Sequence, residues 1–396
     1  MPGISDRLNK AVTSLTPPPI PLVLDWAKEY KGDYGPMLNV SQAVPGYPSH
    51  PKLYKWLSEA AASSDFSSYG AVKGDDLLRA NLATHLTSLF GAHVDFEETQ
   101  ITSGCNQAFY AALLTLAAPG EKVLLTNPCF FNHEYSLRLL GLEPGFVDCK
   151  QEYCFVPQLE DIEAAIDHKT KALVVISPNN PTGAVYPAED LAKIFDLCRA
   201  KGIWLVMDET YRDFLPAGQT RPHSLFQKDN WRDTLVQLYS FSKAYAIPGH
   251  RIGAVTANRT ICEEIEKTVD NLQICAPRAA QYAVAMGLAE LGDWRAKNAG
   301  IMAQRAEAFK TAIISANGWE IAASGAYFAY VRHPMQNLGA LEVTERLAKE
   351  FGILSVPGEF FGRGQERFIR FSFANTEPAE LEPLAERLNA MASSVD

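Results

Sequence analysis

The sequence lacks the long apolar runs and the basic surplus that mark membrane and nucleic-acid-binding proteins. No window approaches the roughly 18 uninterrupted apolar residues of a membrane helix. The first 21 residues, MPGISDRLNKAVTSLTPPPIP, have no sustained apolar stretch, so we expect neither a signal peptide nor a membrane anchor. Lys and Arg number 36 against 46 Asp and Glu, a net charge of -10 with no basic run. We therefore expect no nucleic-acid partner.

The sequence also lacks paired cysteines. An odd number of cysteines without a CxxC pair argues against a disulfide framework and a zinc site, and suits a reducing compartment. We therefore expect a cytoplasmic protein. The cysteines are Cys105, Cys129, Cys149, Cys154, Cys198, Cys262 and Cys275.

What the sequence does have is the alternation of an α/β protein. The run LEDIEAAI precedes KALVVIS, and AEDLAKIFDLCRAKG precedes IWLVMD, which predicts helices followed by strands of a mostly parallel sheet. In the second of these predicted helices, Leu191, Ile194, Phe195 and Cys198 recur at helical spacing and form one apolar stripe. The predicted strands carry apolar residues at successive positions, which is typical of strands covered on both faces. They are residues 122–126, 171–176, 203–207, 234–239 and 251–256.

The ends of the chain differ from this central pattern. Prolines 17, 18, 19 and 21 predict an extended arm near the N-terminus. From about residue 284 long helical patterns are followed by GAYFAYVR, GILSVPG and FIRFSFA. A chain of 396 residues exceeds the roughly 250–300 residues at which a single core stops growing. We therefore expect a second, smaller α+β domain at the C-terminal end.

Polar residues follow several predicted strands at the point where each strand ends. In open α/β sheets, ligands bind beyond these carboxyl ends. Each residue alone is an ordinary turn, cap or surface charge, but together they bring a carboxylate, a lysine, hydroxyls, amides and an arginine to one edge. They lie in SGCN (103–106), SPNNPTG (177–183), DETY (208–211), SFSK (240–243) and at Arg251.

The segments SPNNPTG, DETYRDF and SFSKAYAIPGHRIG resemble the signature of class I/II, fold-type I aminotransferases, which use pyridoxal 5'-phosphate (PLP). The run SVPGEFFGRGQERFIRFSFA resembles the small domain of the same family, and the likeness extends in order from about Tyr69 to Ala374. It implies an α/β fold, with a mostly parallel, seven-stranded sheet flanked by helices in a large domain and a smaller α+β C-terminal domain. We expect an N-terminal arm with part of the small domain in residues 1–46, the large PLP-binding domain in 47–283 and the small domain in 284–396.

The resemblance also implies the chemical roles of five residues. Lys243 would form the internal aldimine with PLP and shuttle the proton between the substrate α-carbon and the cofactor. Asp208 would keep the pyridine nitrogen protonated. Tyr211 and Asn180 would donate to the phenolate oxygen, and Asn180 would also contact the substrate. Arg370 would bind the substrate α-carboxylate as a bidentate cation.

Other residues match the family's binding positions for the rest of the cofactor. Phe130 would stack on the ring, whereas Phe131 is expected in the core. Tyr69 would reach the phosphate of the neighbouring subunit, which implies a homodimer with shared active sites. The residues expected at the phosphate are Gly104, Cys105 and Asn106 at a helix N-terminus, the hydroxyls of Ser240 and Ser242, and Arg251.

Some positions depart from the family pattern and bear on specificity. Cys105 replaces a small or hydroxyl residue, so its phosphate contact is expected through the backbone alone. Asn106 stands where acid-specific relatives carry a lysine, which favours a neutral amino acid over strict aspartate specificity. Arg278 could meet an acidic side chain in a partner's site, but a surface role is favoured. His133 is expected to form part of the pocket wall.

The leading hypothesis is transfer of an amino group from an L-amino acid to a 2-oxo acid by a ping-pong mechanism. The alternative is another PLP reaction on the same scaffold: β-elimination as in carbon–sulfur lyases, γ-substitution, or cyclisation as in aminocyclopropane-carboxylate synthases. A transcription regulator with a vestigial aminotransferase domain is not favoured. Such a protein would add a helix-turn-helix module, and a non-catalytic one would be expected to have lost Lys243 or Asp208, both of which are present.

Overall fold

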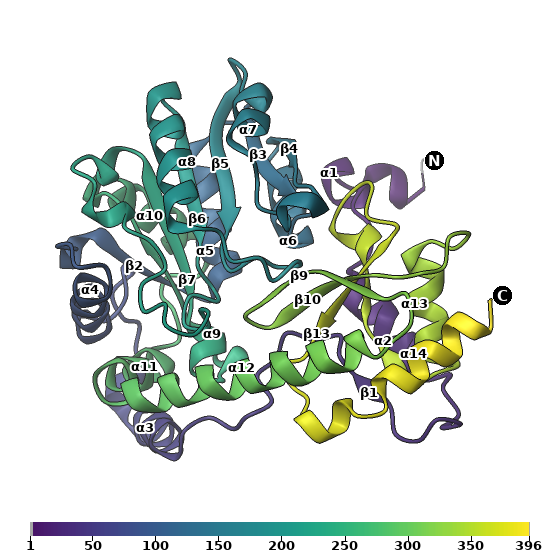
Figure 1. Cartoon of the computed structure of the whole chain (residues 1–396). Helices are drawn as coiled ribbons and strands as arrows, with labels where there is room; N and C mark the ends of the chain where they lie inside the picture. The colour runs from purple at the N-terminus through teal and green to yellow at the C-terminus, as the bar shows by residue number, and fades with distance from the viewer. Residues whose placement is uncertain (1–2, 396) are drawn as a thin grey trace.

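The computed structural model describes residues 3–395, which form two sheet-based regions side by side (Figure 1). A seven-stranded sheet with helices around it lies on the left of the view, and a four-stranded sheet lies on the right. The long helix α12 (Gly292–Ile314) runs along the base of both. This arrangement leaves the carboxyl ends of the central strands facing the smaller sheet.

The seven-stranded sheet has the order β2-β8-β7-β6-β5-β3-β4. All neighbouring pairs are parallel except those of β8, which runs antiparallel to β2 and β7. The expected mostly parallel, seven-stranded sheet is therefore confirmed. Its strands are β2 (Thr99–Thr102), β3 (Lys122–Asn127), β4 (Glu143–Asp148), β5 (Thr170–Ile176), β6 (Trp204–Asp208), β7 (Leu235–Ser240) and β8 (Gly253–Thr256).

Helices cover this sheet on both faces because successive side chains of a strand point to opposite sides. In β6, Leu205 and Met207 join one hydrophobic core, whereas Val206 joins the core on the other face. The predicted stripe of α8 lies in the first of these cores, where Leu191 and Cys198 are buried. The helices of this region are α3 (Pro51–Ala62), α4 (Asp76–Phe90), α5 (Cys105–Leu116), α6 (Phe131–Leu139), α7 (Leu159–Ala165), α8 (Ala188–Lys201), α9 (Phe241–Ala244), α10 (Arg259–Leu272) and α11 (Arg278–Glu290).

The second region is built on an antiparallel sheet of order β12-β13-β10-β9. A separate two-stranded parallel pair, β1 with β11, joins the N-terminal part of the chain to this C-terminal region. The division of the chain at residues 46/47 and 283/284 stays a prediction. The elements are β1 (Leu38–Asn39), β9 (Glu320–Gly325), β10 (Phe328–Arg332), β11 (Ile353–Leu354), β12 (Val356–Pro357), β13 (Phe368–Ser372), α13 (Ala340–Lys349) and α14 (Leu384–Ser393).

The prediction of an extended arm through the prolines was wrong beyond Pro18. Helix α1 (Lys10–Thr13) precedes the prolines, and α2 (Pro19–Ala27) begins at Pro19 and includes Pro21. Proline is tolerated in the first turn of a helix, since the N–H groups there have no partner within the helix. Helix α2 therefore carries Ile20 to the edge of the cavity between the two regions.

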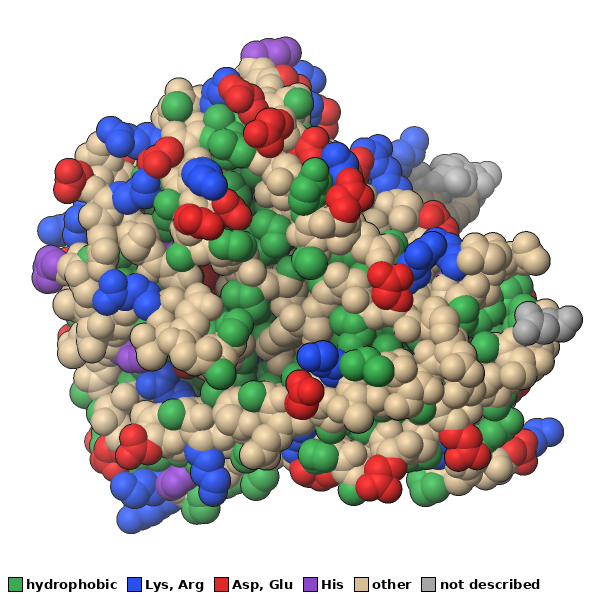
Figure 2. Space-filling model, viewed as in Figure 1, with side chains coloured by type: hydrophobic (Ala, Val, Ile, Leu, Met, Phe, Trp, Pro, Cys, Tyr) green, Lys and Arg blue, Asp and Glu red, His purple; other side chains and the backbone are tan. Residues whose placement is uncertain are grey.

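The outer surface is of mixed charge. Figure 2 shows Lys, Arg, Asp and Glu side chains interspersed over this face, with hydrophobic side chains also exposed toward its centre. Among residues 3–395, none of the helices combines the length and the apolar character that crossing a bilayer requires.

The loop after β5 packs closely against the small sheet, and Gly183 makes this possible. Its φ is +76°, and an added Cβ would lie 2.5 Å from the amide nitrogen of Gly325 and would also collide with the carbonyl of Phe328. Gly202, which ends α8, has a φ of +66° but no atom within 4 Å of such a Cβ. Alanine at either position would have an unfavourable φ, but only at position 183 would its Cβ also collide with neighbouring atoms. Comparing the two substitutions therefore separates the steric cost from the conformational cost.

We expect Gly183→Ala to lower the free energy of unfolding by about 2–4 kcal/mol, because overpacking adds to the conformational cost. Gly202→Ala should cost only about 1 kcal/mol. Urea unfolding of both variants measures the difference. Equal losses would show that the contact between the loop and the β9–β10 hairpin adds no constraint.

Candidate active site

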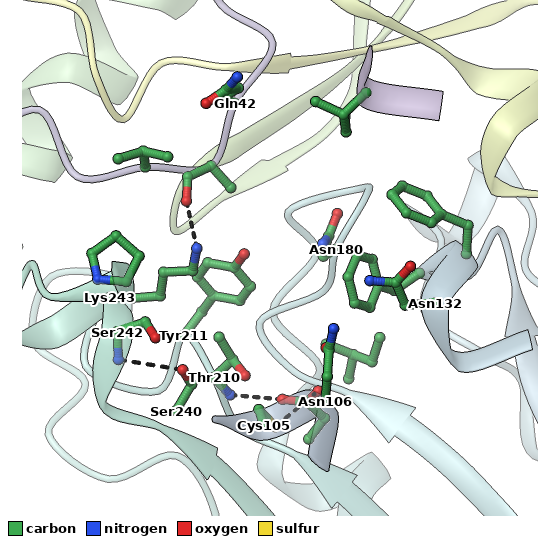
Figure 3. A pocket seen from close by; sticks show the side chains of 18 of the residues that line it. Gln42, Cys105, Asn106, Asn132, Asn180, Thr210, Tyr211, Ser240, Ser242 and Lys243 are labelled. Atoms are coloured by element: carbon green, nitrogen blue, oxygen red, sulfur yellow. Dashed lines mark hydrogen bonds between the residues drawn. The ribbon is translucent and has the colours of Figure 1, made fainter. Parts of the chain in front are cut away.

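A cavity of about 490 Å³ lies where the ends of β5, β6 and β7 face the small sheet and the N-terminal segment (Figure 3). Most of the site residues expected from the sequence line it, although they come from six separate segments. Its lining is Pro18, Ile20, Gln42, Ala43, Val44, Cys105, Asn106, Phe130, Phe131, Asn132, Ile176, Asn180, Asp208, Thr210, Tyr211, Ser240, Ser242, Lys243, Pro248, Arg251 and Arg370.

Lys243 is placed in the cavity by the short helix α9, which follows β7 directly. Its Nζ donates to the carbonyl oxygen of Ala43 at 2.5 Å (Figure 3). In the described part of the chain no carboxylate lies within ion-pair distance of this amine. Burial, together with the nearby charges of Arg370 and Arg251, lowers the pKa of Lys243 to about 8. A much larger fraction of this amine is therefore neutral near physiological pH than for a lysine of ordinary pKa, although the charged form still predominates.

Asp208 is the last residue of β6 and is 5% exposed. Its Oδ1 accepts from the backbone N–H of Thr210 at 2.9 Å, and its Oδ2 lies 3.4 Å from His133 Nε2 and 3.6 Å from Cys105 Sγ. Burial by itself would raise the pKa of Asp208, but the contacts with His133 and Thr210 outweigh it, so the pKa is lowered. The carboxylate is therefore held in its charged form.

His133 supports Asp208 from α6 in a way that sequence reasoning missed. Its ring is buried and stacks on Phe109, with centroids 3.9 Å apart and planes within 5°. The stacking fixes the ring so that Nε2 faces Asp208. The sequence placed His133 near the site but contained no signal for this contact, because the histidine and the aspartate are distant in the chain.

Arg370, on β13, closes the opposite side of the cavity. The guanidinium is 3% exposed and donates to Asn180 Oδ1 at 3.0 Å and to the carbonyl of Ser41 at 2.6 Å. It also lies 5.0 Å from the ring centroid of Phe328 and 4.9 Å from that of Phe361. Burial lowers the pKa of Arg370 to about 10. Within residues 3–395 it has no carboxylate partner, so the cavity holds a buried cation whose contacts are neutral.

The far end of the cavity gathers donors at the start of α5. Gly104, at the N-cap with a φ of +85°, leaves the helix without a side-chain cap, and an added Cβ there would collide with the Arg251 guanidinium. Ser240 Oγ accepts from the N–H of Ser242 at 3.3 Å, while the buried Oγ of Ser242 has no hydrogen-bond partner. These groups and the N-terminal N–H groups of α5 form a site suited to an anion.

Most of the remaining expected residues also line the cavity. Asn106 lines it with an exposed side chain, and burial raises the pKa of the Cys105 thiol and the Tyr211 phenol, which keeps both protonated. Phe130 is half-buried and lines the wall, as does the more deeply buried Phe131.

Tyr69 lies outside the cavity and is 77% exposed. Its loop is held by Arg278, which pairs with Asp75 at 3.2 Å and donates to the carbonyl of Ser68 at 3.4 Å. The role expected for Tyr69 across a subunit boundary stays a prediction.

Several lining residues were not anticipated from the sequence. Pro18 and Ile20 come from the start of α2, Gln42 and Val44 from the segment before α3, and Thr210 from the turn after β6. Thr210, two residues after Asp208, could have been found from the strand-end pattern. The others have no local signal, because only the packing of the N-terminal segment brings them to the site.

The chain is similar along nearly its whole length to known aminotransferases. It is 27% identical to an aspartate aminotransferase of Sulfolobus acidocaldarius, covering 94% of each chain. It is likewise 27% identical to aromatic-amino-acid aminotransferase 2 of Thermococcus litoralis, covering 98% of this chain and 97% of that one. Among solved structures, a Thermus thermophilus aspartate aminotransferase double mutant superposes with a TM-score of 0.89 at 26% identity, covering 99% of this chain and all of that one.

The likeness also holds at the level of the family. The profile of aminotransferase class I and II, a family that uses PLP, matches residues 35–388. The match spans both sheet regions and every residue that lines the cavity except Pro18 and Ile20. The chain therefore belongs to the class I and II aminotransferase family and is a transaminase.

Proposed function

We propose that the cavity binds PLP and that the enzyme moves an amino group from an L-amino acid to a 2-oxo acid in two alternating half-reactions. The observation that carries this proposal is Lys243, an enclosed amine without a carboxylate partner that shares its cavity with the charged Asp208. When bound, PLP supplies an aldehyde that reacts with amines and a pyridine ring that takes up an electron pair.

The residues present fit the polar groups of PLP. The orphaned Ser242 Oγ, the uncapped start of α5 and the Arg251 guanidinium suit a phosphate group. Asp208 is suited to hold a proton on a ring nitrogen, because its carboxylate stays charged in a buried place. Asn180 and Tyr211 line the same cavity and offer donors to an oxygen on the ring.

Lys243 moves the proton in this proposal. A neutral Nζ accepts a proton and returns it, and a lowered pKa places that exchange near neutral pH. The hydrogen bond from Nζ to the Ala43 carbonyl limits where the amine can lie, and so does the position of the Lys243 backbone within α9. Arg370 orients the other reactant by holding its α-carboxylate, since a planar guanidinium binds a carboxylate through two parallel hydrogen bonds.

We further propose that the transferred amino acid has an uncharged side chain. The cations of the cavity lining are Lys243, Arg251 and Arg370, and each already has a role above. The rest of the wall opposite the phosphate end is apolar or carries amides, with Ile20, Val44 and Phe130 facing the cavity. An acidic side chain would find no cation to pair with there among the residues that the structure describes.

A homodimer with shared active sites is part of the proposal. Tyr69 is a large exposed side chain, and Arg278 holds its loop through Asp75 and Ser68. A fixed, exposed tyrosine is suited to contact a second copy of the chain, where its hydroxyl would donate to the phosphate.

The half-reactions test the proposed function. The PLP-loaded enzyme, given L-phenylalanine or L-methionine without an oxo acid, should lose its visible absorbance band and release one equivalent of oxo acid per subunit. L-aspartate should react at least about 10-fold more slowly, since the apolar wall gives it no charge partner. Release of ammonia while the band persists would contradict transamination and favour the elimination alternative.

The pKa of Lys243 predicts a pH profile for cofactor uptake. Below about pH 8 the amine is mostly charged and unreactive, and above it mostly neutral, so the rate at which the apoenzyme takes up PLP should rise and level off with a midpoint near pH 8. Nα-acetyl-lysine is the control, and its reactivity should keep rising to about pH 10.4. A midpoint in the enzyme that matches the control would contradict the enclosure of Lys243.

Mixed dimers test the shared site. A dimer of a Tyr69→Phe subunit and a Lys243→Ala subunit has one intact Lys243, and under this proposal that site receives the wild-type Tyr69 of the other subunit. It should therefore retain PLP like the wild type, whereas the Tyr69→Phe homodimer should lose about 10-fold in affinity, as for one hydrogen bond to a charged group. Weakened retention in the mixed dimer would place Tyr69 at its own subunit's site.

A further inference from the structure

Two buried tyrosine hydroxyls meet at the main-chain carbonyl of Lys243. Tyr47 OH donates to this oxygen at 3.1 Å and Tyr327 OH at 3.3 Å. The hydroxyls lie 3.3 Å from each other, and the residues are 8% and 0% exposed. A buried phenol needs a hydrogen-bond partner, and here both phenols find it at the backbone of the same lysine.

Within the turn that carries Lys243, the Ala246 N–H donates to the Lys243 carbonyl at 3.3 Å and the Ile247 N–H to the Ser242 carbonyl at 3.1 Å. These bonds join neighbouring residues only and do not attach the turn to the rest of the protein. Helix α9 contains only four residues, and a helix this short is not stable without outside contacts. Ala246, just after it, has a φ of +53°, which is unfavourable for a residue other than glycine. Ser49 Oγ lies 2.9 Å from the carbonyl of Tyr245 and 2.7 Å from that of Ala246. The turn is thus held from outside.

The segment that supplies Tyr47 also contacts the Lys243 amine and the Arg370 guanidinium. We call residues 40–49 the strap. Its Ala43 carbonyl accepts from Lys243 Nζ at 2.5 Å, and its Ser41 carbonyl accepts from Arg370 at 2.6 Å. Lys243 is therefore held at both ends, by its amine and by its backbone, through one segment.

The strap is fixed to the small-sheet region. The carbonyl of Val40 accepts from Ser372 N at 2.7 Å, and the N–H of Gly46 donates to the Ala374 carbonyl at 2.9 Å. Tyr327 precedes β10 of the same region. Both hydroxyls at the Lys243 carbonyl thus depend on the position of the small sheet relative to α9.

We propose that Tyr47 and Tyr327 are positioning residues that fix the backbone of Lys243, and through it the reactive amine, to the small-sheet region. The proposal rests on the proposed function of Lys243. Each hydroxyl has a single proton, so Tyr47 can donate to the carbonyl while Tyr327 donates either to the same carbonyl or to Tyr47. Either tyrosine alone can still hold the carbonyl, and removal of both leaves it without a side-chain donor.

The test compares Tyr47→Phe, Tyr327→Phe and the double variant with a matched control, Tyr245→Phe. Tyr245 is a buried tyrosine two residues from Lys243, and within residues 3–395 its hydroxyl has no hydrogen-bond partner. One measurement is the rate and pH midpoint of PLP uptake by the full-length apoenzyme, followed by absorbance. The others are kcat, the melting temperature, and the affinity of the PLP-loaded enzyme for propanoate, which has a carboxylate but no amine.

We expect each single variant to slow PLP uptake and kcat by no more than about 3-fold, and the double variant to slow both by about 10-fold to 100-fold, the range that a misplaced reactive group costs. The midpoint of uptake in the double variant should move above pH 8, because a displaced amine is better solvated. Propanoate affinity should stay within about 2-fold, since Arg370 is untouched. Tyr245→Phe should match the wild type.

The proposal is overturned if the double variant behaves as Tyr245→Phe does, or if the rates fall only in proportion to the melting temperature with an unchanged pH midpoint. Lys243→Ala separates this result from a failure of the proposed function. If Lys243→Ala retains the absorbance band and full activity, the role of Lys243 fails, and the positioning role fails with it. If Lys243→Ala loses both and the tyrosine variants do not change, the positioning role alone is wrong.

Discussion

The site depends on an excess of enclosed positive charge. Lys243 and Arg370 are enclosed in one cavity, which the exposed Arg251 also lines. Among the described residues that line it, the one carboxylate is Asp208, which is already contacted by His133. Enclosed charges without opposite partners are costly, and a lowered pKa at Lys243 and at Arg370 records that cost. Under the proposed function, a phosphate at one end and a carboxylate at the other would supply the missing negative charge. The cavity is thus suited to ligands that carry an anionic group at each end.

Consecutive acidic residues at the end of β6 lie on opposite sides of the large sheet. Asp208 faces the cavity, whereas the next residue, Glu209, is fully buried on the other side, where His223 Nε2 lies 2.5 Å from its carboxylate and Gln237 of β7 donates to it. Burial opposes the charge of Glu209, but His223 and Arg212 outweigh it, so its pKa is lowered. The turn that presents Asp208 and Tyr211 is therefore tied down from behind by a second charged cluster.

Local sequence patterns predicted the parts of the site that follow strands. Asp208 stands directly after an apolar run and Lys243 four residues after another, so their arrival at one sheet edge follows from parallel strands. Strand β4 was not predicted, because its residues, EPGFVD, alternate weakly and include proline and glycine at the sheet edge. Helix α2 was mistaken for an extended arm, since a proline-rich start is compatible with both.

The strap and its contacts could not be predicted, because they depend on how the two regions pack. Tyr47 and Lys243 are 196 residues apart in the sequence, and Ser41 and Arg370 are 329 residues apart. No periodicity links such positions, and the resemblance to a family names a residue's role without the neighbours that hold it.

The geometry of the strap nonetheless has a consequence for catalysis. Arg370 and Lys243 belong to different regions, yet Ser41 and Ala43 of the same short segment contact both. Under the proposed function, a carboxylate bound at Arg370 would compete with the Ser41 carbonyl for the guanidinium donors. Ser41 lies two residues from Ala43, whose carbonyl contacts the lysine amine. If Arg370 and Lys243 have the proposed roles, this segment links the group that would bind the substrate carboxylate with the group that would move the proton.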